Sequence, residues 1–107
     1  MFKQKFNAAL TGTQKVSVTF YSKEDRSSRT FKCAPMDYGP GRHAHDGKDR
    51  YHLWNFEGDV RQHVLSLLPE QITDLRVLDE RFEPADFITW STKASPWFVA
   101  RDWGRYS

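Results

Sequence analysis

The sequence predicts one small, mostly-β domain, a compact five-stranded antiparallel barrel with a short helical or extended appendage at its C-terminal end. Three observations predict this fold class. Short segments alternate apolar and polar residues with a period of two, turn residues separate them at short spacing, and 107 residues suit a single domain. We therefore expect a lead segment at 1–13, the barrel at 14–84 and an aromatic-rich appendage at 85–107.

The first two expected strands, at 14–21 and 29–36, flank a polar and charged turn at 22–28. Both strands alternate with a period of two, which is typical of strands that are buried on one face. The apolar face of the first strand carries Val16, Val18 and Phe20. In the second strand we expect Pro35 to end the strand or to lie at a sheet edge, because proline has no N–H to donate to a neighbouring strand.

The remaining three strands are expected at 50–56, 60–68 and 72–78, after a long glycine-rich loop at 37–49. The strand at 50–56 carries large apolar side chains on both faces, so we expect it to be central or covered on both sides. The short spacing between strands favours antiparallel pairing over α/β units. The expected core of the closed sheet consists of Val16, Val18, Phe20, Leu53 and Val77.

Composition excludes several protein classes. A formal net charge of +2 is too small to indicate a nucleic-acid-binding protein by itself. A single cysteine excludes an internal disulfide and suits a reducing compartment. No apolar run approaches the roughly 20 residues needed to cross a bilayer, so we expect a cytoplasmic protein with no membrane association.

The sequence contains no recognisable catalytic machinery, and we expect no enzymatic activity, no cofactor and no metal. Its scattered carboxylates form no pair for acid–base chemistry, and Cys33 lies on an alternating strand face, where a buried, inert thiol is expected. One alternative stays open for the histidines. His43 and His45, beside Asp46, could share a metal with His52 or His63, or could titrate near neutral pH.

Several short motifs between residues 14 and 84 follow an order known from one family. They are the first strand Val16–Tyr21, Arg29 and Pro35 in the second strand, Arg50 before Tyr51-His52-Leu53, the turn Phe56-Glu57-Gly58-Asp59, and the exit strand Val77–Pro84. Together they resemble the WYL domain, a small SH3/Sm-like barrel of bacterial regulators, here in a standalone and divergent form. The resemblance implies a regulatory or sensory binding role. The segment where family members usually carry arginines reads Ser66-Leu67-Leu68-Pro69-Glu70-Gln71 here.

Basic and aromatic residues of the third strand and its surroundings form the candidate ligand-binding surface. It consists of Tyr38, Arg42, Arg50, His52, Trp54 and Arg61. In small barrels, aromatic rings stack on bases while cations follow the phosphates. We therefore expect a nucleotide or single-stranded nucleic acid as ligand. The alternative is that these aromatic residues belong to the core and that the cations are an ordinary surface.

The appendage is the second candidate binding surface. Its large aromatic residues are Trp90, Trp97, Phe98 and Trp103, and an arginine lies among them. This composition is typical of protein interfaces, so a protein partner or a homodimer is one interpretation. The other is that the appendage docks within its own chain over an open barrel edge. A short helix is expected near Pro84, because proline is favoured in the first turn of a helix.

Overall fold

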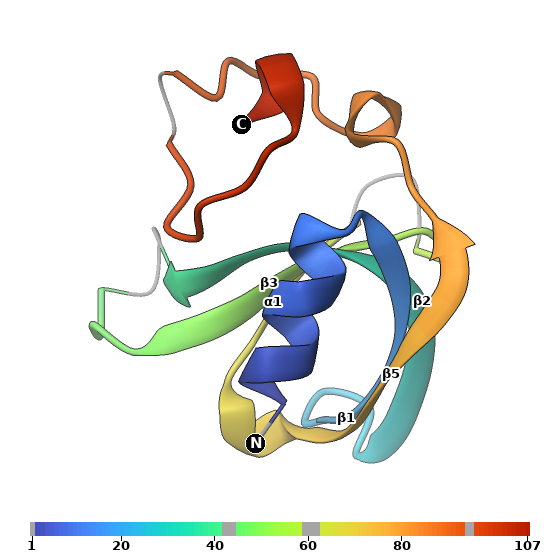
Figure 1. The fold of residues 1–107 in the computed structure, drawn as a ribbon. Helices are drawn as coiled ribbons and strands as arrows, with labels where there is room; N and C mark the ends of the chain where they lie inside the picture. Colours follow the sequence, from blue (N-terminus) through green and yellow to red (C-terminus); the bar gives the residue numbers. More distant parts are fainter. Residues whose placement is uncertain (1, 42–44, 59–62, 94–95) are drawn as a thin grey trace.

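The computed structural model describes residues 2–41, 45–58, 63–93 and 96–107. Its centre is one five-stranded antiparallel sheet with the strand order β4-β3-β2-β1-β5 (Figure 1). The elements are α1 (Lys3–Thr11), β1 (Gln14–Ser22), β2 (Ser27–Pro40), β3 (Asp49–Asn55), β4 (Val64–Leu67), η1 (Pro69–Gln71), β5 (Ile72–Arg81), η2 (Pro84–Asp86) and η3 (Gly104–Tyr106). The predicted mostly-β class is therefore confirmed.

The sheet is open. Strands β4 and β5 are its two edges, and no pairing joins them within the described residues. The strands curve around α1 (Figure 1), but the expected closure into a barrel is not seen. Strand β1 lies between β2 and β5, so consecutive hairpins build most of the sheet and the fifth strand returns to the first.

The expectation for Pro35 holds in part. Strand β2 does not end there but continues to Pro40. Strand β1 pairs with β2 only as far as Cys33, so Pro35 pairs with β3 alone and lies at a local edge of the sheet. The pairing with β3 also shifts register between Pro35 and Asp37, and edges and bulges are the places where a sheet tolerates a proline. The extension also takes in residues 37–40, which were expected to open a long loop.

Helix α1 falls in the lead segment and was not predicted. Its buried residues are Phe6, Ala9 and Leu10, which are spaced i, i+3 and i+4 and therefore share one helix face. Phe6 meets Tyr51 edge-on, with ring centroids 4.9 Å apart. The helix covers the face of the sheet on which Tyr51 lies. The core therefore lies between the open sheet and the helix, and not inside a closed barrel.

The core contains most of the expected residues. Val16, Val18, Leu53 and Phe20 are buried, and the predicted alternation of β1 and β3 is confirmed. Val77 is a correction, because 40% of it is exposed. It lies on edge strand β5, which has a neighbour on one side only, whereas Leu75 on the same face of that strand is fully buried. Within the described residues, no helix is long and apolar enough to span a membrane.

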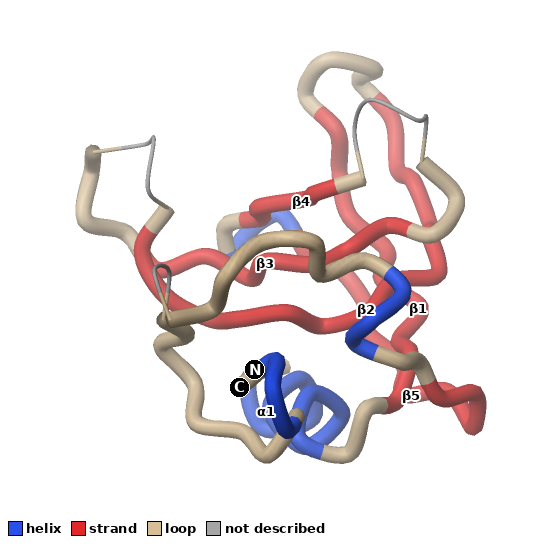
Figure 2. Tube along the Cα trace, turned by 90° about the horizontal axis from the view of Figure 1, so that it is seen from above, coloured by secondary structure: helices blue, strands red, loops and turns tan. Residues whose placement is uncertain are grey.

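Residues 85–107 are called the tail below, and the part of them that the structure describes lies against the sheet. After β5 the chain forms η2 and crosses the sheet, as Figure 2 shows from above. It then folds back on itself into η3, near the C-terminal end of α1 (Figure 1). The tail therefore brings residues from the end of the sequence onto the strands in its middle.

Candidate functional site: the face of the sheet that meets the tail

Strands β2, β3 and β4 share a face that points away from α1. Cross-strand pairing places the same side of each strand together, because paired residues point to the same face. We call it the tail face, and its members are Asp37, Gly39, Arg50, His52, Trp54, Val64 and Ser66. Tyr51 and Leu53, which alternate with them on β3, face α1 and are buried.

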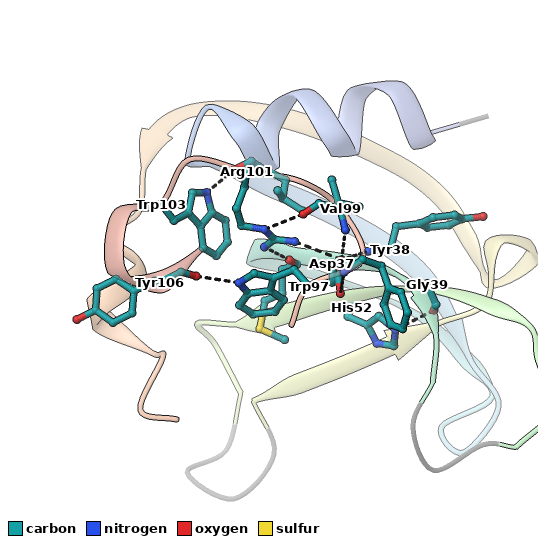
Figure 3. A network of polar contacts seen from close by, with 12 residues as sticks. Asp37, Tyr38, Gly39, His52, Trp97, Val99, Arg101, Trp103 and Tyr106 are labelled. Carbon is teal, nitrogen blue, oxygen red and sulfur yellow. Dashed lines mark hydrogen bonds and ion pairs between the residues drawn. The ribbon is translucent and has the colours of Figure 1, made fainter. Parts of the chain in front are cut away.

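Asp37 is the centre of the contact between this face and the tail. Asp37 is 7% exposed, and it directly follows the β-bulge in strand β2. The carboxylate accepts hydrogen bonds from the backbone N–H groups of Phe98 and Val99, each at 3.0 Å. It also accepts one from Arg101 Nη2 at 3.2 Å (Figure 3). One carboxylate therefore fixes both the backbone and a side chain of the tail.

Arg101 is enclosed on all sides. Its side chain is 1% exposed, and its guanidinium lies 4.1 Å from the ring centroid of Trp97 and 4.4 Å from that of Trp103. Besides Asp37 it donates to the backbone carbonyls of Val99 and Met36. Burial lowers the pKa of Arg101 to about 10, and the nearby carboxylate of Asp37 partly opposes this shift. The charge is tolerated because a carboxylate, two carbonyls and two indole rings replace its water.

Trp103 joins the tail to the rest of the core. It is 5% exposed, its indole N–H donates to the carbonyl of Leu10 at 3.0 Å, and its ring meets Phe82 at 5.5 Å. Trp97 donates in turn to the carbonyl of Tyr106 at 2.8 Å (Figure 3). The tail is thus tied to the end of α1, to the residue after β5 and to itself.

Gly39 lets the tail approach the sheet. A Cβ atom at this position would lie 2.6 Å from a ring carbon of Phe98 and 3.1 Å from its Cβ, so the ring could not stay in place. The requirement for glycine here comes from close approach, since its backbone φ is not in the left-handed region.

The variant Gly39→Ala is therefore expected to lose ~1–3 kcal/mol of unfolding free energy, the usual cost of overpacking a well-packed site. Urea denaturation measures this loss. Because Phe98 itself is 59% exposed, Phe98→Ala should cost little alone and should relieve most of the effect of Gly39→Ala. A Gly39→Ala protein as stable as the wild type would show that the tail does not pack here.

His52 bridges two strands on the tail face. Its Nε2 lies 3.0 Å from the carbonyl oxygen of Gly39 and its Nδ1 lies 2.8 Å from Ser66 Oγ. A carbonyl can only accept, so Nε2 carries the proton, and in the neutral ring the Ser66 hydroxyl donates to Nδ1. His52 therefore holds β2, β3 and β4 together at the centre of this face (Figure 3).

Trp54 is already stacked. Its ring lies 4.6 Å from His63 at an interplanar angle of 12°, and 5.4 Å from Phe87 at 17°. Phe87 is buried at the start of the tail. His63 Nδ1 donates to the carbonyl oxygen of Asn55 at 2.9 Å, because a carbonyl can only accept. Two neighbouring rings thus compete with any ligand for the faces of Trp54.

The structure brings together only part of the predicted ligand surface. Arg50, His52 and Trp54 share the tail face, but Tyr38 lies on the α1 face, where it packs on Tyr51 and under the ammonium of Lys3. Arg42 and Arg61 lie outside the described residues. Alternation along β2 and β3 separates Tyr38 from the other residues, because its cross-strand partner is a core residue.

Arg50 does not present a free charge on this face. It forms a two-pronged ion pair with Asp46, at 3.0 and 2.9 Å. This contact lowers the pKa of Asp46 well below its ordinary value and raises that of Arg50. Its side chain is 15% exposed, so a phosphate would have to displace the carboxylate to reach the guanidinium.

The four predicted tail residues differ in their exposure. Trp103 is buried and Trp97 is partly buried, whereas Trp90 is 39% and Phe98 59% exposed. Two residues that organise the tail, Asp37 and Arg101, were not predicted as site residues. Arg101 was visible as a cation between aromatic residues, but no pattern in the sequence indicated its partner more than 60 residues away.

Metal and thiol chemistry find little support in the described part of the chain. No group of three or more His, Cys, Asp and Glu side chains gathers there in a way that could hold a metal. His43 lies outside the described residues, and both His52 and His63 are engaged in hydrogen bonds within the sheet. Cys33 is buried, as predicted. Burial raises the pKa of its thiol to about 12, with a smaller contribution from Glu57.

Cys33 is therefore expected to resist thiol reagents. Only the thiolate reacts, and it is scarce in the folded protein until the pH approaches about 12. Ellman's reagent at about pH 8 should leave the native chain unmodified and should modify one thiol once guanidinium unfolds it. Rapid reaction of the folded protein at that pH would contradict both the burial and the direction of the pKa shift.

Exposed apolar side chains lie at both ends of the tail face. Val64, the neighbour of Trp54 on β4, is 53% exposed, and Phe98 covers the backbone of Gly39 at the other end. Between them lie His52 and Ser66. Comparisons with protein-family models, with curated proteins and with solved structures found no match for this chain.

Proposed function

We propose that the chain is a non-enzymatic binding module that recognises a protein partner through its tail face. The observation that carries the proposal is the pair Val64 and Phe98, which have the largest exposed fractions among the large apolar side chains described. Phe98 lies over Gly39 and Val64 pairs with Trp54, so His52 and Ser66 lie between the two apolar side chains in the strand pairing. Exposed apolar side chains around a few polar groups are typical of protein-binding patches.

The size of the surface supports a macromolecular partner. From Arg50 to Trp54 the strand advances by roughly 13 Å at about 3.3 Å per residue, and two further strands flank it. Its polar groups are already satisfied by one another, as His52 is with Ser66 and Gly39. A partner therefore gains affinity mainly from the apolar ends, and the hydrogen-bonded histidine lies between them.

Peptide selection against the full chain tests the proposal. Peptides selected on immobilised wild-type protein are expected to lose at least about tenfold in affinity when Val64→Asp or Phe98→Ser is introduced, because each change removes an apolar anchor. Val77→Asp is the matched control, since this valine is also on an edge strand and 40% exposed but lies far from the tail face in the strand order. Peptides sensitive to Val77→Asp and indifferent to the other two would place the binding surface elsewhere.

A second candidate is the nucleotide or single-stranded nucleic acid implied by the WYL resemblance. The shared face of Arg50, His52 and Trp54 supports it, because it places a cation beside two rings, and a base would have to displace His63 or Phe87 to reach the ring of Trp54. Titration with short labelled oligonucleotides at low and moderate salt tests it. Binding that weakens with salt and with Arg50→Gln would support this candidate, and no binding at low salt would remove it.

We also propose that the sheet is of the SH3/Sm-like type and that the module is regulatory and cytoplasmic, as the resemblance implies. The strand order supports the fold proposal, because the first four antiparallel strands pair consecutively and the fifth lies beside the first. A solved structure in which β4 and β5 pair, or are bridged by neighbouring residues, would support it. A solved structure in which β4 and β5 are neither paired nor bridged would contradict the proposed fold type.

A further inference from the structure

The tail contacts the sheet in the way a bound peptide contacts its receptor. Asp37 holds two consecutive backbone N–H groups, those of Phe98 and Val99, and Arg101 supplies a charged anchor to the same carboxylate. The Phe98 ring lies on the bare backbone of Gly39. Backbone recognition combined with one charged and one aromatic anchor specifies a short sequence, here residues 98–101, rather than a general apolar contact.

The tail is also a small unit folded on itself. Thr92 Oγ1 donates to the carbonyl of Arg105 at 3.5 Å, the indole N–H of Trp97 donates to the carbonyl of Tyr106 at 2.8 Å, and the backbone N–H of Trp103 donates to Ser107 Oγ at 2.6 Å. These contacts stay within the tail, so the unit would keep them wherever it docked.

An exposed connection separates this unit from the sheet. Phe87 and Ile88 are buried with the core, and Thr92 is buried within the tail, whereas residues 89–91 between them are exposed. Among the described residues, the hydrogen bonds and ring contacts of residues 89–93 reach only other tail residues. The connection therefore has the properties of a hinge, because its backbone can change direction without breaking a contact to the sheet.

We propose that residues 92–107 exchange between two copies of this chain, each tail docking at Asp37 of the other copy. The occupant is known from the structure, since the site already holds this segment within one chain. All docking contacts are the same in the exchanged dimer, and only residues 89–91 change conformation. Docking within one chain is favoured by its high effective concentration, so the dimer forms as protein concentration rises or as the hinge is shortened. This proposal goes beyond the binding role of the tail face and does not depend on it.

Complementation between two full-length variants tests the exchange. Asp37→Ala retains a normal tail but has a damaged site, and Arg101→Ala retains a normal site but has a damaged tail. Isotope-labelled Asp37→Ala protein is mixed with unlabelled Arg101→Ala protein, and amide exchange at Phe98 and Val99 is followed by NMR. Exchange in trans is expected to slow these two amides at least about tenfold on mixing, because the labelled tail regains a carboxylate acceptor. Unchanged rates at equimolar, high concentration would overturn the proposal.

A hinge deletion gives an independent test if either variant folds poorly. Removing residues 89–91 from the otherwise wild-type chain shortens the connection by up to about 10 Å, so the tail can no longer return to its own sheet. Sedimentation is expected to show a dimer, and adding Asp37→Asn to the shortened chain is expected to weaken that dimer at least about tenfold. A shortened chain that remains monomeric at all concentrations would overturn the exchange.

Discussion

Replacing Asp37 by alanine is expected to lower the free energy of unfolding by ~3–5 kcal/mol, the usual cost of removing one partner of a buried ion pair. Arg101 would remain buried between Trp97 and Trp103 without its carboxylate, and the N–H groups of Phe98 and Val99 would lose their acceptor. Urea or thermal denaturation, followed by tryptophan fluorescence, measures the effect. Three of the four tryptophans lie in the tail, so its release should also change the emission of the folded protein.

Two further variants separate the charge from the packing. Asp37→Asn keeps the size of the side chain and one acceptor, so it should cost less than Asp37→Ala. The double variant Asp37→Ala/Arg101→Met removes the buried charge altogether and should recover part of the lost stability, because an apolar replacement of both partners avoids an unpaired charge. An Asp37→Ala protein within about 0.5 kcal/mol of the wild type would mean that the ion pair does not hold the tail.

Replacing Trp103 by alanine is expected to cost ~3–5 kcal/mol, as for other large aromatic side chains removed from a core. The indole fills the space between the tail, Phe82 and the end of α1, and it covers one face of the Arg101 guanidinium. The substitution therefore leaves a cavity and also exposes a charge that depends on enclosure. Chemical denaturation of the purified full chain measures this loss.

Trp90→Ala is the matched control for Trp103→Ala. Trp90 has the same side chain in the same tail but is 39% exposed, so its removal should cost no more than about 1 kcal/mol. Trp103→Phe keeps most of the apolar volume and loses only the hydrogen bond to Leu10, which should cost roughly 1 kcal/mol plus the difference in ring size. Equal losses for Trp90→Ala and Trp103→Ala would contradict the arrangement of the tail.

The strands were predictable because their signal is local. Alternation of Val16, Val18 and Phe20 indicated the buried face of β1 directly, and the same pattern placed Leu53 in the core. Helix α1 carries an equally local signal in the spacing of Phe6, Ala9 and Leu10. The helix has only nine residues, so this signal is short and the sequence alone indicates only a lead segment. The end of β2 could not be predicted in this way, because the strand continues past Pro35 through a bulge and ends at Pro40.

The candidate site was less predictable because it depends on contacts between distant parts of the sequence. Alternation within 50–56 correctly placed His52 and Trp54 together, but it could not show that Tyr38 on the next strand faces the opposite side. Asp37 and Arg101 are separated by 64 residues, and neither belongs to a motif. A buried pair of this kind becomes visible only when the chain has folded, since each residue alone reads as an ordinary surface charge.

Amide hydrogen exchange at Phe98 and Val99 in the wild-type chain tests most directly whether the tail is part of the folded domain. Both N–H groups donate to a 7% exposed carboxylate, so they should exchange at least about a hundredfold more slowly than in an unstructured peptide, and Asp37→Ala should abolish this protection. Exchange of both amides at the rate of a free peptide, in a protein whose β1 and β2 amides are protected, would show that the tail is not docked at Asp37.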